Sequence, residues 1–86
     1  MKLKLEFVAR DIAGETLLVP VGKTNYTFNG MITLNEMGAE IWKRLPQAET
    51  EEEIVQGILE EYDVTREQAQ KDVADFLDHL RELGIL

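Results

Sequence analysis

Several residue types are missing from the 86-residue sequence or are scarce in it, and each gap excludes a class of function. Cysteine and serine are absent, which excludes disulfides, thiolate metal ligands and a serine nucleophile. The single histidine, His79, has no second histidine at ligand spacing and is interpreted as a surface residue. No Gly-rich phosphate loop is present. We therefore predict a protein that is not an enzyme and that has no cofactor and no metal site.

Long apolar stretches are missing as well. The longest uninterrupted one runs from Leu17 to Val21 and contains Pro20, whereas a membrane-spanning helix needs about 20 apolar residues. The first residues, Met1-Lys2-Leu3-Lys4, alternate in a way that is not typical of a signal peptide. We predict a cytoplasmic protein that does not enter a membrane.

Positive charge is scarce in the second half of the chain. The formal net charge is −8, and residues 47–86 hold twelve acidic and three basic side chains, against five and six in residues 1–46. Nucleic-acid phosphates are bound by basic faces, so this distribution argues against a nucleic-acid partner. Two interpretations of the acidic half remain: a solvated surface that keeps a small domain soluble, or a field that steers a basic partner.

Alternating apolar residues predict three β-strands in the first third of the chain. Leu3, Leu5 and Phe7 alternate with charged residues, and we expect this strand to reach Ile12. A turn at Ala13-Gly14 leads to a strand at residues 17–21. A polar break follows at residues 22–25. The alternation of Tyr26 and Phe28, a turn at Asn29-Gly30 and a strand at residues 31–34 come next. Pro20 should lie at a strand end or face an open edge, because it cannot donate a ladder hydrogen bond.

Helical periodicity predicts three helices in the remainder. Asn35, Thr50 and Thr65 are favourable N-cap residues, and the two threonines are each followed three residues later by Glu or Gln, as in a capping box. We expect Trp42, Ile54, Ile58 and Leu80 to be buried together. The order β-β-β-α-α-α predicts a single α+β domain over residues 1–86, winged-helix-like, with a three-stranded antiparallel sheet and at least one exposed edge strand.

A distinctive stretch runs from Asn29 to Trp42 and contains the pattern Leu-Asn-x-x-Gly-x-x-Ile-Trp. Together with Thr50–Val55, Glu61–Val64 and the closing Phe76–Leu86, it resembles the PqqD family, which comprises coenzyme PQQ synthesis protein D and its relatives, also called RiPP recognition elements. The resemblance covers nearly the whole chain. It implies the same order of three strands followed by three helices.

The resemblance also implies a function. Members of the family bind the leader segment of a ribosomally made precursor peptide as an antiparallel strand beside the third strand, in a groove closed by the third helix. They present the peptide to a modifying enzyme, often a radical SAM protein. Carried over by position, the peptide-binding residues are Met31, Ile32, Thr33 and Leu34 on the strand and Ala69, Val73, Phe76 and Leu77 on the helix.

Two alternatives stay open at this point. Periodicity does not distinguish a core position for Phe76 from a place in the wall of a peptide groove. The same exposed edge also suits a winged-helix protein–protein interaction module, or a homodimer, without any role in leader-peptide binding.

Overall fold

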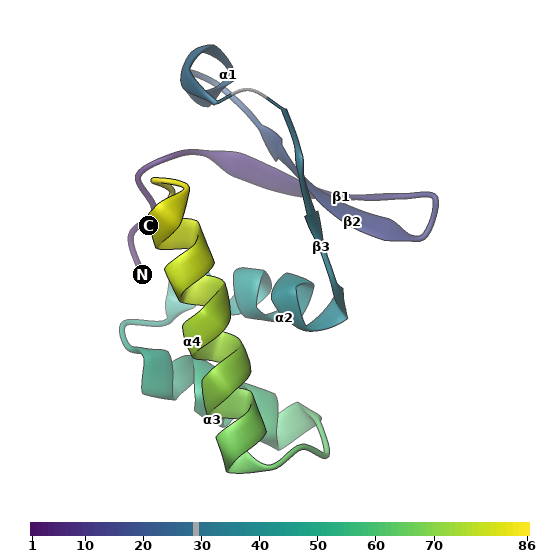
Figure 1. Ribbon diagram of the computed structural model, residues 1–86, viewed down its shortest axis with the longest axis vertical. Helices are drawn as coiled ribbons and strands as arrows, with labels where there is room; N and C mark the ends of the chain where they lie inside the picture. The colour runs from purple at the N-terminus through teal and green to yellow at the C-terminus, as the bar shows by residue number, and fades with distance from the viewer. Residues whose placement is uncertain (29) are drawn as a thin grey trace.

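A three-stranded antiparallel sheet forms one part of the molecule, and the long helices lie to one side of it (Figure 1). The computed structural model describes residues 1–28 and 30–86, apart from the side chains of residues 26 and 27. The strands, in sheet order, are β1 (Phe7–Ile12), β2 (Glu15–Pro20) and β3 (Ile32–Leu34). The predicted antiparallel sheet is confirmed, and Pro20 is the last residue of its strand, as expected.

Three long helices follow the sheet, as predicted. They are α2 (Glu36–Arg44), α3 (Glu51–Glu61) and α4 (Arg66–Glu82), and a 3-10 turn, η1 (Leu45–Gln47), extends α2. The predicted winged-helix-like α+β fold is confirmed, with one further helical turn, α1 (Thr24–Thr27), inserted before β3. In the described part of the chain, none of the helices combines the length and the apolar character needed to cross a bilayer.

The turn α1 occupies residues 24–27, so the extended backbone expected at Tyr26 is wrong, whereas Phe28, which follows the turn, is extended. The side-chain oxygen of the buried Thr24 accepts a hydrogen bond from the backbone N–H of Glu6 at 2.7 Å. The N–H of Phe28 donates to the carbonyl of Thr24 at 2.8 Å and closes the turn. A tertiary hydrogen bond of this kind leaves no period-two signal in the sequence. The predicted Asn29-Gly30 turn includes Asn29, which lies outside the described residues.

The first strand begins later than its alternating pattern predicts. Leu3 and Leu5 are half-buried and pack against the core, but β1 starts only at Phe7. The N–H of Lys4 donates instead to the carbonyl of Ile85 at 2.7 Å. The N-terminal segment is therefore held by the C-terminal end of the chain and not by β2, whose last residue is Pro20.

The predicted helix N-caps are present, but the capping boxes are only half formed. The side chains of Asn35, Thr50 and Thr65 accept hydrogen bonds from backbone N–H groups three residues later, at 2.7, 3.3 and 3.1 Å. The carboxylate of Glu53 accepts from the N–H of Glu49 and not from the cap residue. The Gln68 side chain donates to Asp72. One orphan amide of each helix is thus satisfied as predicted.

The core lies between the sheet and the three long helices. Ile54, Ile58 and Leu80 are fully buried there, as predicted, but Trp42 is only half-buried. Its ring packs edge-to-face on Phe7, with 6.3 Å between the ring centroids. The prediction that Trp42 is buried together with these residues is wrong, because its side chain packs at the edge of the core and also lines a pocket between β1 and α2.

The turn between β1 and β2 contains a strained alanine, which generates a prediction. Both turn residues have positive φ, 53° at Ala13 and 83° at Gly14. Alanine is disfavoured in this region, whereas asparagine tolerates it. We expect Ala13→Asn to raise the free energy of unfolding by up to about 1 kcal/mol. Gly14→Ala, the matched control, should lower it. Urea denaturation followed by circular dichroism measures both, and a loss of stability in Ala13→Asn would contradict the assignment of the strain.

Candidate functional site

The strand β3 lies at an edge of the sheet, and its hydrogen-bonding direction follows from the neighbouring ladder. The N–H of Val21 donates to the carbonyl of Glu6 at 3.1 Å. The backbone N–H and C=O groups of the odd-numbered residues of β2 therefore point toward β1. Even-numbered residues of β2 therefore face β3, where Leu18 lies opposite Ile32. Because backbone groups alternate along a strand, the N–H and C=O of Thr33 point to the open edge. The edge thus offers a free donor and acceptor near its centre.

The side chains of β3 and its approach divide between the two faces of the sheet. Leu34 is buried against the helices at 7% exposure, and Ile32 on the same face is half-buried. Thr33 is exposed on the opposite face, and Met31, which precedes the strand, is 60% exposed. The edge strand therefore has an apolar side toward the helices, together with backbone groups that are free to pair.

The four residues predicted on α4 do not share one environment. Ala69, Val73 and Leu77 belong to the core and are at most 1% exposed. Their side chains have no surface to offer a ligand in this conformation. Phe76 is half-buried and lines a pocket. Phe76 thus packs against the core with part of its ring and lies beside the start of α2 with the rest.

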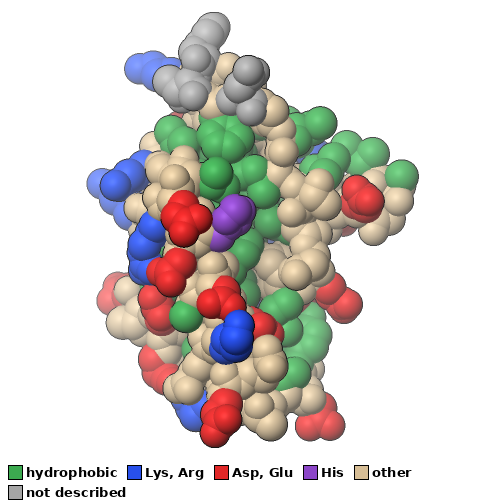
Figure 2. Space-filling model, viewed as in Figure 1, with side chains coloured by type: hydrophobic (Ala, Val, Ile, Leu, Met, Phe, Trp, Pro, Cys, Tyr) green, Lys and Arg blue, Asp and Glu red, His purple; other side chains and the backbone are tan. Residues whose placement is uncertain are grey.

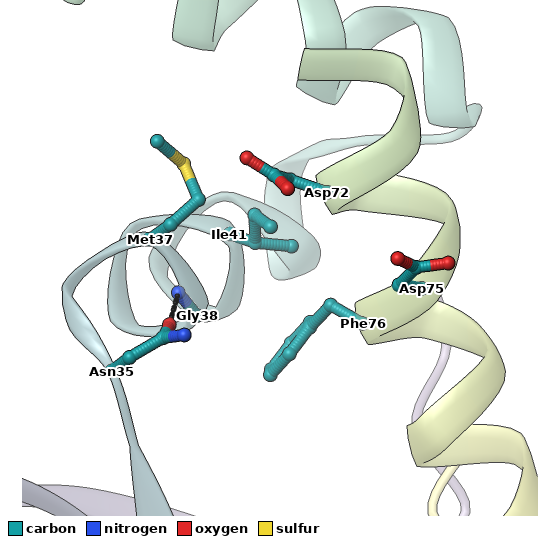
Figure 3. Close-up of a pocket in the computed structure, with 7 residues that line it drawn as sticks. All are labelled: Asn35, Met37, Gly38, Ile41, Asp72, Asp75 and Phe76. Carbon is teal, nitrogen blue, oxygen red and sulfur yellow. Dashed lines mark hydrogen bonds between the residues drawn. The ribbon is translucent and has the colours of Figure 1, made fainter. Parts of the chain in front are cut away.

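This pocket lies between α2 and α4, just beyond the end of β3, and has a volume of about 330 Å³. We call it the α2–α4 pocket. Figure 3 shows the side chains that line it, with the ring of Phe76 directed toward the first turn of α2. The lining residues are Asn35, Met37, Gly38, Ile41, Asp72, Asp75 and Phe76.

Most of these residues were not predicted from the sequence to belong to the site, and the reason is geometric. On α4, the stripe of residues 69, 73, 77 and 80 faces the core, and the adjacent stripe of residues 72, 76, 79 and 83 lies beside it. The apolar Phe76 on the second stripe looks like a member of the first. A usable signal was Asp72 at helical spacing from Phe76, since it shows that this stripe reaches the surface.

Gly38 permits the close approach of α4 to α2 at the pocket. A Cβ placed on Gly38 would lie 3.2 Å from Cε1 of Phe76 and 3.1 Å from Oδ1 of Asn35. That same oxygen accepts the hydrogen bond from the N–H of Gly38, so the cap and the aromatic contact occupy one small space. The Leu-Asn-x-x-Gly pattern therefore has a local physical role: its asparagine caps α2, and its glycine leaves room for the ring of Phe76.

Two carboxylates give the pocket its charge. Asp72 is half-buried and accepts a hydrogen bond from the side-chain amide of Gln68 at 2.8 Å. Asp75 is exposed and forms an ion pair with Lys71 at 2.7 Å. The hydrogen bond to Asp75 raises the pKa of Lys71 above its ordinary value. The pocket thus combines apolar side chains with two carboxylates, one of which is paired with Lys71.

The accessible face of α4 continues past the pocket toward its C-terminus. His79 is exposed and Leu83 is half-buried, one and two turns beyond Phe76. Figure 2 shows the histidine in purple beside hydrophobic side chains in green. Within residues 1–28 and 30–86, no three Asp, Glu, His or Cys side chains are arranged to hold a metal ion.

Two other pockets lie away from the open edge of β3. One, between β1 and α2, is lined in part by Trp42, Ala9 and Lys43. The other surrounds Arg44, which pairs with Glu61 at 3.0 Å and fixes α2 to α3. The second pocket is explained by the ion pair that joins α2 to α3. Of these three pockets, the α2–α4 pocket is the one next to the end of β3, and it is therefore the candidate site.

Comparison with known proteins assigns the chain to a family. The model of the family described as coenzyme PQQ synthesis protein D (PqqD) matches residues 15–86. None of the curated proteins matches this chain in sequence.

Two solved structures are similar over nearly the whole chain. "Lasso peptide synthetase B1 complexed with the leader peptide" has 24% identity and a TM-score of 0.72, with 98% of this chain and 93% of that chain covered. "TbiB1 in Complex with the TbiA(beta) Leader Peptide" has 29% identity and a TM-score of 0.71, with 99% and 94% covered. The first of these establishes the similarity of fold only.

The contact of Gly38 with Phe76 generates a prediction. Alanine is the better helix former by about 1 kcal/mol, yet we expect Gly38→Ala to leave stability unchanged or lower it, because the added methyl group displaces the ring. In a Phe76→Ala background the same substitution should be less destabilising, because the contact with the ring is gone and only that with Oδ1 of Asn35 remains. A double-mutant cycle from urea denaturation measures the difference, and additive effects would show that Gly38 and Phe76 do not interact.

Proposed function

The chain belongs to the PqqD family, and on that premise we propose that it binds the leader segment of a ribosomally synthesised precursor peptide and presents it to a modifying enzyme. The observation that carries this proposal is the open edge of β3, where the backbone groups of Thr33 face outward. An extended peptide pairs with such groups and continues the sheet. Both similar solved structures are named as leader-peptide complexes, which supports the same class of ligand.

The proposed peptide strand runs antiparallel to β3, with side chains alternating between solvent and the helices. Met31, Ile32 and Thr33 then form the strand side of the site, and Leu34 continues the same edge. Phe76 forms the wall on α4. Ala69, Val73 and Leu77 support that wall from the core, since they are buried beneath the surface. Backbone pairing supplies affinity and the α2–α4 pocket supplies selectivity.

We propose that the domain contributes binding only, and that a separate enzyme such as a radical SAM protein carries out the modification. A ribosomally made ligand is present in the cytoplasm, which is the location that we propose. The leader loses conformational freedom on binding, so we expect a dissociation constant in the micromolar range, or about −8 kcal/mol.

Substitutions at Thr33 test strand addition. Thr33→Pro removes the outward N–H but no ladder hydrogen bond to β2, so we expect the fold to persist. Leader peptides encoded beside the gene should bind it about three- to tenfold more weakly, the equivalent of one lost hydrogen bond. Thr33→Val, the matched control, keeps the N–H and should bind normally. Isothermal titration calorimetry gives the affinities, and circular dichroism verifies the fold.

An NMR titration of the unmodified chain locates the bound peptide. The largest amide shifts should fall on residues 31–34 and on the exposed stripe of α4. Shifts confined to α3, with residues 31–34 silent, would exclude strand addition. Self-association through β3 in the absence of peptide would instead favour the interaction-module alternative.

A further inference from the structure

We infer that the α2–α4 pocket receives a basic side chain, lysine or arginine, from the bound peptide. The inference rests on the proposed function and goes further by naming a residue class that the ligand must contain. It derives from three observations: the composition of the pocket, the ion pairs of the acidic half of the chain, and the position of the pocket relative to β3.

The pocket brings apolar side chains and two carboxylates together. The half-buried Met37 and Phe76 provide the apolar surface, with the buried Ile41 behind them, and Asp72 and Asp75 provide the carboxylates (Figure 3). Lysine and arginine carry an apolar stem that ends in a cation, and they bury the stem while the charge stays at a polar rim. A guanidinium or ammonium group over the ring of Phe76 gains a further cation–π attraction. The volume of about 330 Å³ accommodates one such side chain.

Two of the three basic residues of the acidic half pair with acids outside the pocket, and the third, Lys71, pairs with Asp75 at its rim. Residues 47–86 contain only three: Arg66 pairs with Glu52 at 2.6 Å, Lys71 with Asp75 at 2.7 Å, and Arg81 with Glu51 at 3.3 Å. Among the described residues, none forms an ion pair with Asp72, which is half-buried and has the neutral amide of Gln68 as its hydrogen-bond donor. The charge of Lys71 acts on Asp72 only without direct contact. A half-buried carboxylate that no cation contacts is favourably paired by a ligand that brings one.

Other side chains fit the pocket less well. An acidic residue would be repelled by both aspartates. An aromatic or aliphatic residue would contact Phe76 but would exclude water from Asp72 without replacing the lost hydrogen bonds. The ion pair of Asp75 with Lys71 does not compensate, because both side chains are largely exposed and such pairs contribute little.

The position of the pocket predicts where the basic residue lies in the peptide. Asn35, which follows β3 directly, is part of the pocket, so the pocket adjoins the C-terminal end of this strand. In a peptide antiparallel to β3, the residues at that end come first. The basic residue should therefore precede the residues that pair with β3, and those that follow it should meet the His79 and Leu83 end of α4.

A peptide-display selection tests the inference without knowledge of the natural ligand. The full chain selects binders from a random library of dodecapeptides, in parallel with the variant Asp72→Asn/Asp75→Asn. We expect lysine and arginine to be enriched at one position with the unmodified chain and not with this variant. The control Asp78→Asn/Glu82→Gln removes the same charge from exposed positions on the same helix and should keep the enrichment.

Affinity measurements on one selected peptide provide the quantitative test. Replacing its arginine with citrulline, or its lysine with norleucine, should weaken binding to the unmodified chain about tenfold. The same replacement should change binding to Asp72→Asn/Asp75→Asn less than about twofold. These changes would show that the cation interacts with the two aspartates and not with the general negative field of the protein.

The outcomes separate this inference from the proposed function. Selected peptides that shift the amides of residues 31–34 but show no basic enrichment would overturn the inference and leave the proposed function intact. The inference also fails if the enrichment is equal in Asp72→Asn/Asp75→Asn. If no peptide is selected, or if the binders leave residues 31–34 unshifted, both the inference and strand addition are wrong.

Discussion

The alternation of hydrogen bonds in the β1–β2 ladder decides which backbone groups of the sheet remain available. The bond from Val21 to Glu6 sets the odd-numbered residues of β2 toward β1. Thr16 and Leu18 then face β3, and so does Pro20, which has no N–H to donate. The ladder between β2 and β3 extends no further than Leu18, and β3 is short, with Thr33 facing outward. The open edge is a consequence of this pairing.

The helix α4 has two adjacent functions on two adjacent stripes. One stripe is buried and holds α4 on the core, and the next carries Asp72, Phe76 and His79 along the accessible surface. Close packing of the first stripe fixes the second relative to β3. Gly38 on α2 makes the contact with Phe76 close, because no side chain stands between the ring and the helix backbone. The accessible stripe of α4 therefore lies beside a strand edge with unpaired backbone groups, the arrangement on which the proposed strand addition depends.

The acidic character of residues 47–86 has a structural distribution that net charge alone does not reveal. The bonds of Arg66 and Arg81 to glutamates at the start of α3 connect α3 to α4. These contacts engage two of the three basic residues of this region away from the pocket. Two of the acidic residues of this region, Asp72 and Asp75, line the pocket that adjoins the C-terminal end of β3. The acidic residues of this half are therefore not only a solvated surface, because two of them line the pocket.

The sequence by itself determined the order of the three strands and three long helices, the helix N-caps and the family. Periodicity and N-cap chemistry act within a few residues, so Asn35, Thr50 and Thr65 were identifiable as the starts of α2, α3 and α4. The Leu-Asn-x-x-Gly-x-x-Ile-Trp pattern indicated the PqqD family, to which the chain belongs. β3 was placed within one residue, although the start of β1 was not.

Only the tertiary structure decided which apolar residues are core and which line the pocket. Ala69, Val73 and Phe76 are all compatible with one broad apolar stripe, and the exposed fraction of each depends on how α4 rotates against α2 and the sheet. The turn at Thr24 and the half-buried position of Trp42 depend likewise on contacts with residues distant in sequence. Local patterns carry no information on such contacts, because the partners are brought together only when the chain folds.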